Sequence, residues 1–317
     1  MAVGSRPLVP SSLAPGGLLP GHGRLRTPRS RLGGFVALTK PRIVELLLIT
    51  TLPTMVLAQD GVPPLRLMVT TLAGGALAAG GANAMNMVID RDIDRLMPRT
   101  QGRPLVTGLV GPREAVIFAI ALEVAAFVLL TWQVNLLSAV LALAAMAFYV
   151  VVYTIWLKRT STQNIVIGGA AGAVPVLVGW AAVTGSLAWP PVILFIAIFL
   201  WTPPHFWALA IRYADDYRAA NVPMLPAVAS PVVVGRRMLG YTVALWACTL
   251  VLVPVAGLGW IYTVTAIVLG ALFVGGCLGL LREPTPRRSM QVFAFSISYV
   301  TILFSAMALD VLVHSGW

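Results

Sequence analysis

Long apolar runs alternate with short polar segments along most of the chain. Many of these runs are close to 20 residues long, which is the length that an α-helix needs to cross the hydrocarbon core of a bilayer. They fall at 36–58, 65–89, 115–132, 136–157, 164–184, 189–211, 239–257, 260–281 and 291–313. The pattern predicts an all-α, polytopic membrane protein with nine transmembrane helices arranged around a central cavity.

Composition excludes a soluble protein. The 317 residues are 58% hydrophobic and only 10% charged, whereas a typical soluble domain has about 25% charged residues. Membrane lipid is therefore the expected surrounding, and no nucleic-acid partner is expected, since nucleic-acid binding needs an exposed basic surface. The two cysteines, Cys248 and Cys277, both lie in apolar runs, so we expect packing roles and not a disulfide or a metal pair.

The basic residues orient the predicted spans. The chain has 22 Lys and Arg residues, and in an alternating nine-span arrangement all except Arg66 fall on one side of the membrane. Because cytoplasmic segments are enriched in Lys and Arg, we expect the N-terminus in the cytoplasm and the C-terminus outside.

The two ends of the domain differ in composition. Residues 1–34 are rich in Pro, Gly, Ser and Arg and contain no acidic residue, which predicts a disordered basic tail. A transit peptide is the alternative, but the tail shows no amphipathic period. Residues 35–317 form the predicted transmembrane domain, with cytoplasmic cap loops at 90–114 and 212–238. Glycines such as Gly168 and Gly81 are expected where helices pack closely.

Eleven acidic residues are few enough to place individually, and three of them cluster just after the second span. Asn86, Asp90 and Asp94 are four residues apart, so they line one face of a helix. Carboxylate and amide oxygens on one face suit Mg²⁺, which also takes ligands from water and substrate phosphates. Asp92 is out of phase with this face and is expected to point elsewhere.

Arginines follow the acidic cluster directly, at positions 95, 99 and 103. Guanidinium groups bind phosphate oxygens well, and acidic metal ligands beside them are typical of a diphosphate site. Ordinary membrane anchoring is the simpler interpretation for Arg91. It is less suitable for Asn86, because a polar residue one turn inside an apolar span needs a partner or a function.

A second acidic pair, Asp215 and Asp216, follows the sixth span. If spans 1–4 and 5–8 form a parallel repeat, the ends of spans 2 and 6 occupy equivalent places. We therefore expect both acidic clusters at the same membrane face.

Several stretches together resemble the UbiA intramembrane prenyltransferase superfamily, and within it a branch whose members farnesylate haem. The matching residues cover about 35–313 and include Asn86-x-x-x-Asp90-Arg-Asp-Ile-Asp94-Arg, Arg99-Thr-x-x-Arg103-Pro-Leu, Leu38-Thr-Lys40-Pro-Arg42, Lys158-Arg159-Thr with Asn164, Pro204-His205-Phe206, Asp216-Tyr217 and Pro223-Met-Leu-Pro226. The resemblance implies nine helices with caps over a central cavity, in the plasma (inner) membrane of a bacterium. It also implies Mg²⁺-dependent transfer of farnesyl from farnesyl diphosphate to a vinyl group of protohaem IX, with haem b as a substrate.

The resemblance implies roles for individual residues. Asn86, Asp90 and Asp94 would bind one Mg²⁺ and Asp216 a second. Many superfamily members have a second motif of the Asp-x-x-x-Asp type, but here Ala220 follows Asp216, so Asp215 or Asn221 could complete that site. The expected diphosphate contacts are Arg95, Arg103, Lys158 and Arg218.

Other ionisable residues within the spans have two interpretations. His205 either contacts the porphyrin or is a packed core histidine. Glu45, Glu123 and Asp310 are expected in buried structural hydrogen bonds, although one of them could contact haem. His22 and His314 are expected to have no role.

Three alternatives remain open. A related membrane prenyltransferase would act on an aromatic acid or quinone precursor, a haem-binding membrane protein would lack catalysis, and a cation transporter would use the acidic residues. A transporter would place its acids near the middle of the bilayer, whereas here they lie at one interface. Haem A synthase or assembly factors of terminal oxidases are the expected protein partners of the haem enzyme.

Overall fold

The structure, a computed structural model, describes residues 30–315 apart from the side chains of residues 42–48. Every regular element in this part of the chain is helical. The elements in chain order are α1 (Arg31–Leu38), α2 (Pro41–Gln59), α3 (Leu65–Ile89), α4 (Arg91–Leu96), η1 (Pro98–Thr100), α5 (Pro104–Thr107), α6 (Pro112–Gln133), α7 (Leu136–Ala147), η2 (Phe148–Leu157), α8 (Lys158–Thr160), α9 (Asn164–Thr184), α10 (Trp189–Arg212), α11 (Ala214–Ala219), α12 (Leu225–Val228), α13 (Pro231–Ala256), α14 (Trp260–Arg282) and α15 (Pro286–His314).

Eight helical segments of the described residues are long and apolar enough to cross a membrane. They are α3, α6, the continuous segment Leu136–Thr160, α9, α10, α13, α14 and α15. These eight coincide with the last eight predicted spans, which confirms the all-α polytopic class. The 19-residue helix α2 takes the place of the first predicted span, and the total of nine spans stays a prediction.

The N-terminal boundary differs from the prediction. Residues 31–34, expected in the disordered tail, belong to α1, whose N-terminus is capped by the Ser30 hydroxyl accepting from the Gly33 amide at 3.1 Å. The first apolar run is also broken, since Lys40 adopts a left-handed conformation (φ 51°) before α2 begins at Pro41. A residue before proline is disfavoured in a right-handed helix, which accounts for the break. The rest of the predicted tail lies outside the described residues.

The second predicted cap loop is shorter than expected. It was predicted over 212–238, but α13 begins at Pro231, with the Ser230 hydroxyl accepting from the Val233 amide. The first turns of α13 contain the exposed residues Arg236 and Arg237, so the helix extends beyond its apolar run. A hydropathy pattern locates only the apolar part of such a helix.

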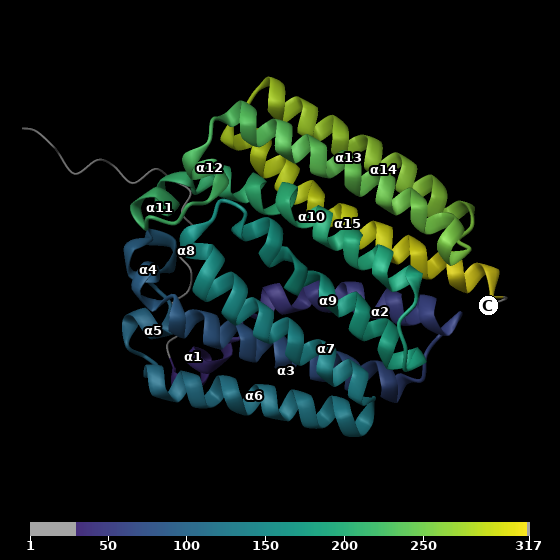
Figure 1. Ribbon diagram of the computed structural model, residues 1–317, viewed down its shortest axis with the longest axis horizontal. Helices are drawn as coiled ribbons and strands as arrows, with labels where there is room; N and C mark the ends of the chain where they lie inside the picture. Colours follow the sequence, from purple (N-terminus) through teal and green to yellow (C-terminus); the bar gives the residue numbers. More distant parts are fainter. Residues whose placement is uncertain (1–29, 316–317) are drawn as a thin grey trace, which may run out of the picture.

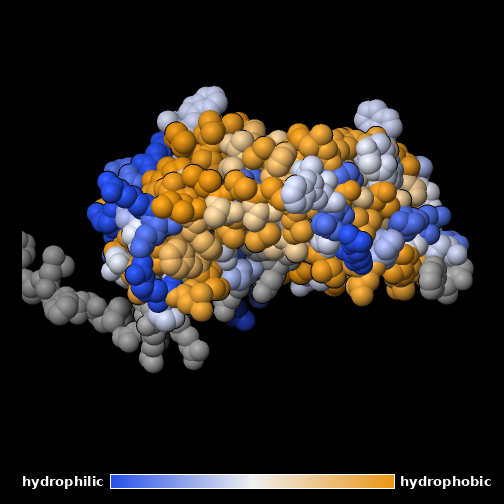
Figure 2. All heavy atoms as spheres, turned by 90° about the horizontal axis from the view of Figure 1, so that it is seen from below, coloured by the Kyte–Doolittle hydropathy of each residue, from blue (hydrophilic) through white to orange (hydrophobic). Residues whose placement is uncertain are grey.

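The long helices lie side by side, and the short ones gather at one end (Figure 1). That end, called here the cap end, contains α4, α5, α8, α11 and α12, whereas the C-terminus lies at the opposite end. α3 packs on α6, α9 packs on α2, α7 and α10, and α15 contacts α2, α10 and α14. Figure 2 shows a broad hydrophobic band on one side of the molecule, with hydrophilic residues mainly toward the ends, as a lipid-facing surface requires.

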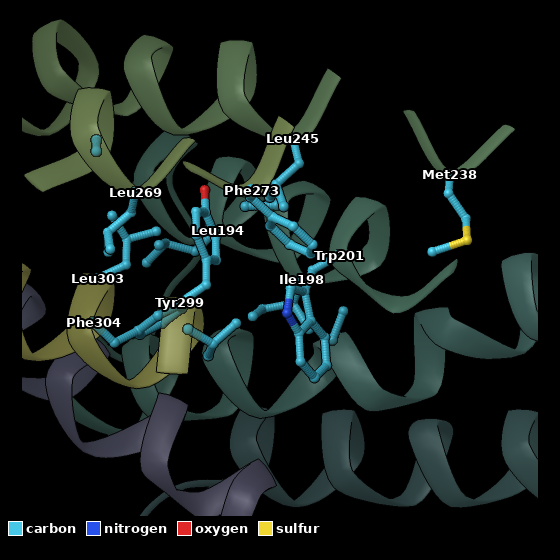
Figure 3. Packing of buried hydrophobic residues seen from close by; sticks show 14 of the residues in the cluster. Leu194, Ile198, Trp201, Met238, Leu245, Leu269, Phe273, Tyr299, Leu303 and Phe304 are labelled. Atoms are coloured by element: carbon cyan, nitrogen blue, oxygen red, sulfur yellow. The ribbon is translucent and has the colours of Figure 1, made fainter. Parts of the chain in front are cut away.

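The largest hydrophobic core joins α10 to α13, α14 and α15, and it includes Trp201, Phe273 and Tyr299 (Figure 3). The Trp201 indole donates to the Ser296 carbonyl at 2.8 Å, which ties α10 to α15. A small apolar space of about 10 Å³ lies among residues that include Leu194, Leu303 and Phe304. This space is too small for a ligand, and the predicted central cavity stays a prediction.

Some glycines allow the close helix contacts that the sequence predicted. A Cβ atom on Gly81 would lie 2.9 Å from the Ala119 carbonyl oxygen of α6. A Cβ atom on Gly179 would lie 2.7 Å from the Thr51 carbonyl oxygen of α2. Because both neighbours are backbone atoms that cannot rotate away, a larger residue at either position would push the helices apart.

Candidate active site

The end of α3 places Asn86 and Asp90 together inside the protein. Both side chains are buried, and the Asn86 amide donates to Asp90 Oδ2 at 2.7 Å and to the Thr154 hydroxyl of η2 at 3.1 Å. The Asp90 amide donates to the Asn86 carbonyl, so the helical path continues through the end of α3. The predicted common face of these two residues is thus present, and the Asn86 side chain orients the Asp90 carboxylate.

Two lysines from other parts of the chain meet this pair. Lys158 forms an ion pair with Asp90, and the Lys40 ammonium donates to Asn86 Oδ1 at 2.7 Å. Removal from water, with smaller contributions from the positive charges of Arg103 and Lys158, lowers the pKa of Lys40 to about 7. Lys158 was a predicted site residue, whereas Lys40 was not. The break at Lys40-Pro41, visible in the sequence, is what turns the Lys40 side chain into the site.

Asp94 lies one turn further along in α4 and is also buried. Arg103 Nη1 lies 2.5 Å from Asp94 Oδ2, and the Thr100 hydroxyl donates to the Asp94 carbonyl at 2.7 Å. The Asp94 amide donates to the Asp90 carbonyl. The structure therefore brings Asn86, Asp90, Asp94, Arg103 and Lys158 into one site, as the sequence predicted.

Asp92 points away from this site, which confirms the out-of-phase prediction. Its two carboxylate oxygens accept from the two terminal nitrogens of Arg159, each at 2.7 Å, and its side chain is 62% exposed. The hydrogen bonds from Arg159 hold the pKa of Asp92 down at about 2. Asp92 thus anchors α4 to the end of Leu136–Thr160 on the solvent side.

The site fits a hard divalent cation. Asp90 Oδ1 and Asp94 Oδ1 are both buried and have no hydrogen-bonding partner, so each carboxylate has one oxygen that is not used by the protein. Within the described residues, no group of three or more His, Cys, Asp or Glu side chains could hold a metal. Two carboxylates are enough for Mg²⁺, because this ion usually takes its other ligands from water and from substrate phosphates.

The second acidic segment meets the first at the cap end. Arg99 in η1 lies 3.8 Å from the Asp216 carboxylate, donates to the Tyr217 hydroxyl at 3.2 Å, and lies over the Tyr217 ring at 5.1 Å. Beneath this contact, buried apolar residues of the two segments form one small core: Ile93, Met97, Ala220 and Val222. The two acidic segments lie at the same end of the bundle, and Arg99, which was not among the predicted site residues, connects them.

Four predicted or alternative site residues lie elsewhere. Asp215 is 96% exposed and pairs with Arg218, and Arg218 also donates to the Ala227 carbonyl at 2.9 Å. Arg95 and Asn221 are exposed. Of the second segment, only Asp216 therefore points toward the first, because α11 directs Asp215 and Arg218 to solvent.

The segment η2 is a π-helix of ten residues, and it supplies side chains that the sequence did not indicate. The Thr154 hydroxyl donates to the Tyr149 carbonyl five residues earlier and accepts from Asn86. The Tyr149 and Tyr153 rings stack with centroids 5.3 Å apart. π-helical turns are rare and are frequent at functional sites. Gly168 of α9 makes room for Tyr153, since a Cβ atom there would collide with the tyrosine ring.

His205 is packed in the core of α10 and α15. Its ring stacks on Trp201 (4.2 Å between centroids) and on Phe293 (4.7 Å). The Ser296 hydroxyl donates to the Phe293 carbonyl at 2.6 Å, so the contact of 2.6 Å between His205 Nδ1 and Ser296 requires the imidazole to donate. The ring is therefore packed between two aromatic side chains, and its remaining lone pair is on Nε2.

The other ionisable residues of the spans have mixed outcomes. Asp310 accepts from the amides of Gly259 (2.5 Å), Ile261 (3.0 Å) and Tyr262 (3.2 Å), which confirms its structural hydrogen bonding. One carboxylate oxygen of Glu123 is buried without a partner, so the hydrogen bond predicted for it is absent at that atom. The Glu45 side chain lies outside the described part of the chain. Cys248 and Cys277 are unpaired thiols, as predicted.

Comparison with known proteins identifies the family of this chain. The model of the UbiA prenyltransferase family matches residues 47–300. Relatives named protoheme IX farnesyltransferase include one from Pseudarthrobacter chlorophenolicus, 56% identical over 87% of this chain and 88% of its own length. Another, from Streptomyces avermitilis, is 52% identical over 89% of this chain and 94% of its own length.

Several solved structures share the fold, two of which illustrate the likeness. A digeranylgeranylglyceryl phosphate synthase superposes with a TM-score of 0.74 at 18% identity, covering 89% of this chain and 99% of that one. A UbiA homologue from Archaeoglobus fulgidus bound to DMAPP and Mg²⁺ gives 0.62 at 18% identity, covering 87% and 99%. The chain belongs to the UbiA prenyltransferase family. Within that family it is similar over almost its whole length to the protoheme IX farnesyltransferases.

Proposed function

We propose that this protein transfers the farnesyl group of farnesyl diphosphate to a vinyl group of protohaem IX, and that water then adds to the cation left on the vinyl side chain and loses a proton, which produces haem O and releases diphosphate. The observation that carries the proposal is the buried group of Asp90, Asp94, Arg103 and Lys158 at the cap end. These residues suit a magnesium-bound diphosphate. The relatives named protoheme IX farnesyltransferase supply the identity of the two substrates.

The proposal includes nine transmembrane helices, with α2 as the first, and the cap end in the cytoplasm of a bacterial cell. The basic residues support this orientation, because cytoplasmic segments are enriched in Lys and Arg. Nearly all the Lys and Arg residues that follow Pro41 lie in four segments on the cap side: 91–113, 158–159, 212–237 and 282–288. At a cytoplasmic site the charged diphosphate group of the substrate can face water, while the prenyl chain of the substrate enters the apolar bundle. The proteins that accept haem O, such as haem A synthase or assembly factors of terminal oxidases, are the remaining predicted partners.

Asp90 and Asp94 are the proposed magnesium ligands, with Asn86 orienting Asp90 and Asp216 facing the same site from α11. Asp90 and Asp94 each have one buried carboxylate oxygen without a hydrogen-bonding partner, which favours this assignment. When bound, Mg²⁺ neutralises the negative charge that accumulates on the diphosphate as it leaves. No residue with a nucleophilic side chain is needed in this reaction, because diphosphate leaves with the bonding electron pair and the vinyl carbon attacks the allylic cation that remains.

The chain's own cations stabilise the same leaving group. Lys158 and Arg103 each hold a carboxylate of the site, and both have further N–H groups with which to bind phosphate oxygens. Hydrogen-bond donors fixed where charge develops stabilise a transition state strongly, since they need no reorganisation. The tyrosines of η2 and the packed caps limit the access of water, so the farnesyl electrophile reacts with the vinyl carbon before water captures it. Arg95 and Arg218 have no place in this scheme.

His205 is proposed to contact the porphyrin through Nε2. Ser296 fixes the donating nitrogen as Nδ1, so Nε2 has the lone pair that an iron or a donor group would require.

The decisive experiment incubates the purified protein with haem b, farnesyl diphosphate and Mg²⁺ and then measures the mass of the haem. We expect a haem that has gained one farnesyl-derived group, and no product when the metal is chelated. Unchanged haem together with a prenylated aromatic acid or quinone precursor in a parallel reaction would contradict the proposal. Haem bound but never modified would instead indicate a binding protein.

A further inference from the structure

Asn164, the first residue of α9, has a side chain that packing does not explain. The residue is fully buried, at 0% exposure, and neither its Oδ1 nor its Nδ2 has a hydrogen-bonding partner. A buried amide without partners is destabilising, and native proteins rarely retain one. A leucine of similar size would fill the same volume without that cost, so the amide needs another reason to be there.

The position of Asn164 is at the edge of the candidate active site. It follows Lys158 of α8 by a tight reversal, in which the backbone N–H of Asn164 donates to the Ser161 carbonyl at 3.3 Å. One turn later, Gly168 faces the Tyr153 ring of η2. Residues four apart share one face of a helix, so the Asn164 side chain lies on the face of α9 that meets η2. Since the two helices run in opposite directions, Asn164 lies toward the Lys158 end.

Other buried atoms without partners point to the same region. Among the described residues, the charged or amide side chains with such atoms are Asp90, Asp94, Arg99, Glu123 and Asn164. Asp90, Asp94 and Arg99 form the site at the cap end, and Asn164 lies at that end of its own helix. Four of these five side chains therefore lie at the end of the bundle where the substrate diphosphate is proposed to bind.

The local charge selects the kind of ligand. The N-terminus of a long helix such as α9 has partial positive charge and favours anions. Lys158 adds a full positive charge beside it. An amide Nδ2–H group in this setting is a donor for an anionic oxygen.

We propose that Asn164 binds the diphosphate of the prenyl substrate by donating from Nδ2 to a phosphate oxygen. This rests on the proposed function only in that a prenyl diphosphate is the donor substrate, and it does not depend on the acceptor. Asn164 is thus a further substrate-binding residue, supplied by α9 and not by either acidic segment.

The test measures binding of farnesyl thiodiphosphate, which the enzyme cannot cleave readily, to the full-length protein in lipid nanodiscs with Mg²⁺. Asn164→Leu is expected to weaken this binding by about 10- to 100-fold, the effect of losing one hydrogen bond to a charged group. Its haem affinity, followed by haem absorbance, and its melting temperature should not fall. The matched control is Gln163→Leu, a neighbouring residue that is only partly buried, and it should bind the thiodiphosphate as the wild type does.

Asn164→Asp provides a second variant of the same shape. A carboxylate beside the diphosphate should weaken thiodiphosphate binding at least as much as leucine does, and it decides the question if the leucine variant does not insert. Wild-type affinity in both variants would overturn the inference, and so would an equal loss of haem and thiodiphosphate binding with a lower melting temperature. If the wild type binds the thiodiphosphate but leaves haem unmodified, the proposed acceptor is wrong and the role of Asn164 stands.

Discussion

The Lys158 ammonium group forms an ion pair with the Asp90 carboxylate, which joins the end of η2 to the end of α3 across 68 residues of sequence. Both side chains are nearly removed from water, at 12% and 0% exposure. Removing one partner of such a pair leaves a buried charge uncompensated. The pair therefore links the stability of the cap end to the chemistry of the site.

Lys158→Met is expected to lower the rate of haem farnesylation at least about 100-fold, because a donor to the leaving group is lost. The free energy of unfolding should also fall, by about 3 kcal/mol, since Asp90 stays buried without its partner. Product formation by mass analysis and thermal melting in nanodiscs measure the two effects. A variant that melts earlier but keeps its rate would limit Lys158 to a structural role.

Asp90→Asn and Asp94→Asn should each abolish turnover while the protein still inserts into membranes. These changes keep the side-chain shape and remove the negative charge that a divalent cation requires. Binding of Mn²⁺ in the presence of farnesyl thiodiphosphate, followed by electron paramagnetic resonance, should weaken in parallel. Asp92→Asn is the control in the same helix, because Asp92 faces solvent and Arg159, and it should keep both activity and metal binding.

Arg99→Gln is expected to reduce activity by about 10- to 100-fold, since it removes a preorganised positive group and the contact between the two acidic segments. Limited proteolysis should also cut near α11 sooner, because α11 loses its partner Arg99. Arg95→Gln removes an arginine from the same segment, but Arg95 is exposed. Equal effects of the two changes would mean that overall positive charge matters and the specific contact does not.

Gly168→Ala should displace the Tyr153 ring, because the added Cβ atom would occupy its place. Overpacking of this kind costs about 1–3 kcal/mol, and the shift of η2 should lower activity as well. A melting curve and a rate for the same preparation test both effects. At Gly240 of α13 an added Cβ atom meets nothing within 4 Å, so Gly240→Ala should leave both values unchanged.

Asp310→Asn should lower stability without lowering activity at moderate temperature. The Asp310 carboxylate caps the N-terminus of α14 through three backbone amides, and losing its charge should cost about 1–3 kcal/mol. This cap lies at the end of the bundle opposite the site, near the C-terminus, so the chemistry is not touched. His314→Gln, a change at a half-exposed neighbour, should have little effect on the melting temperature.

The sequence predicted the long helices well and the fine structure between them less well. Apolar runs located the spans because the length of a run is fixed by the bilayer. The same pattern could not reveal that residues 148–157 form a π-helix, since a run of apolar residues has the same hydropathy whether it forms an α-helix or a π-helix. It also missed α1, whose first residues have the composition of a tail, and the early start of α13.

The site was predicted where residues share one continuous helical face, as Asn86, Asp90 and Asp94 do. It was not predicted where a turn sets the direction of a side chain. Arg95 and Arg99 lie in the same short segment, yet η1 at Pro98–Thr100 turns only Arg99 toward Asp216. Asn164 appeared in the sequence only as part of a resemblance, because lack of a hydrogen-bonding partner is a property of three-dimensional packing.

The number of residues in the π-helix Phe148–Leu157 determines where Lys158 lies relative to Asp90. The hydrogen bonds of a π-helix run from residue i to residue i+5, so deleting one residue between Phe148 and Leu157 would shift the register of everything after the deletion by one residue. The contact between Lys158 and Asp90 would then be lost, while the contact between Thr154 and Asn86 would stay in place if the deletion followed Thr154. We therefore expect a one-residue insertion or deletion in this stretch to be more damaging than the exchange of an exposed apolar side chain such as Val151 for another.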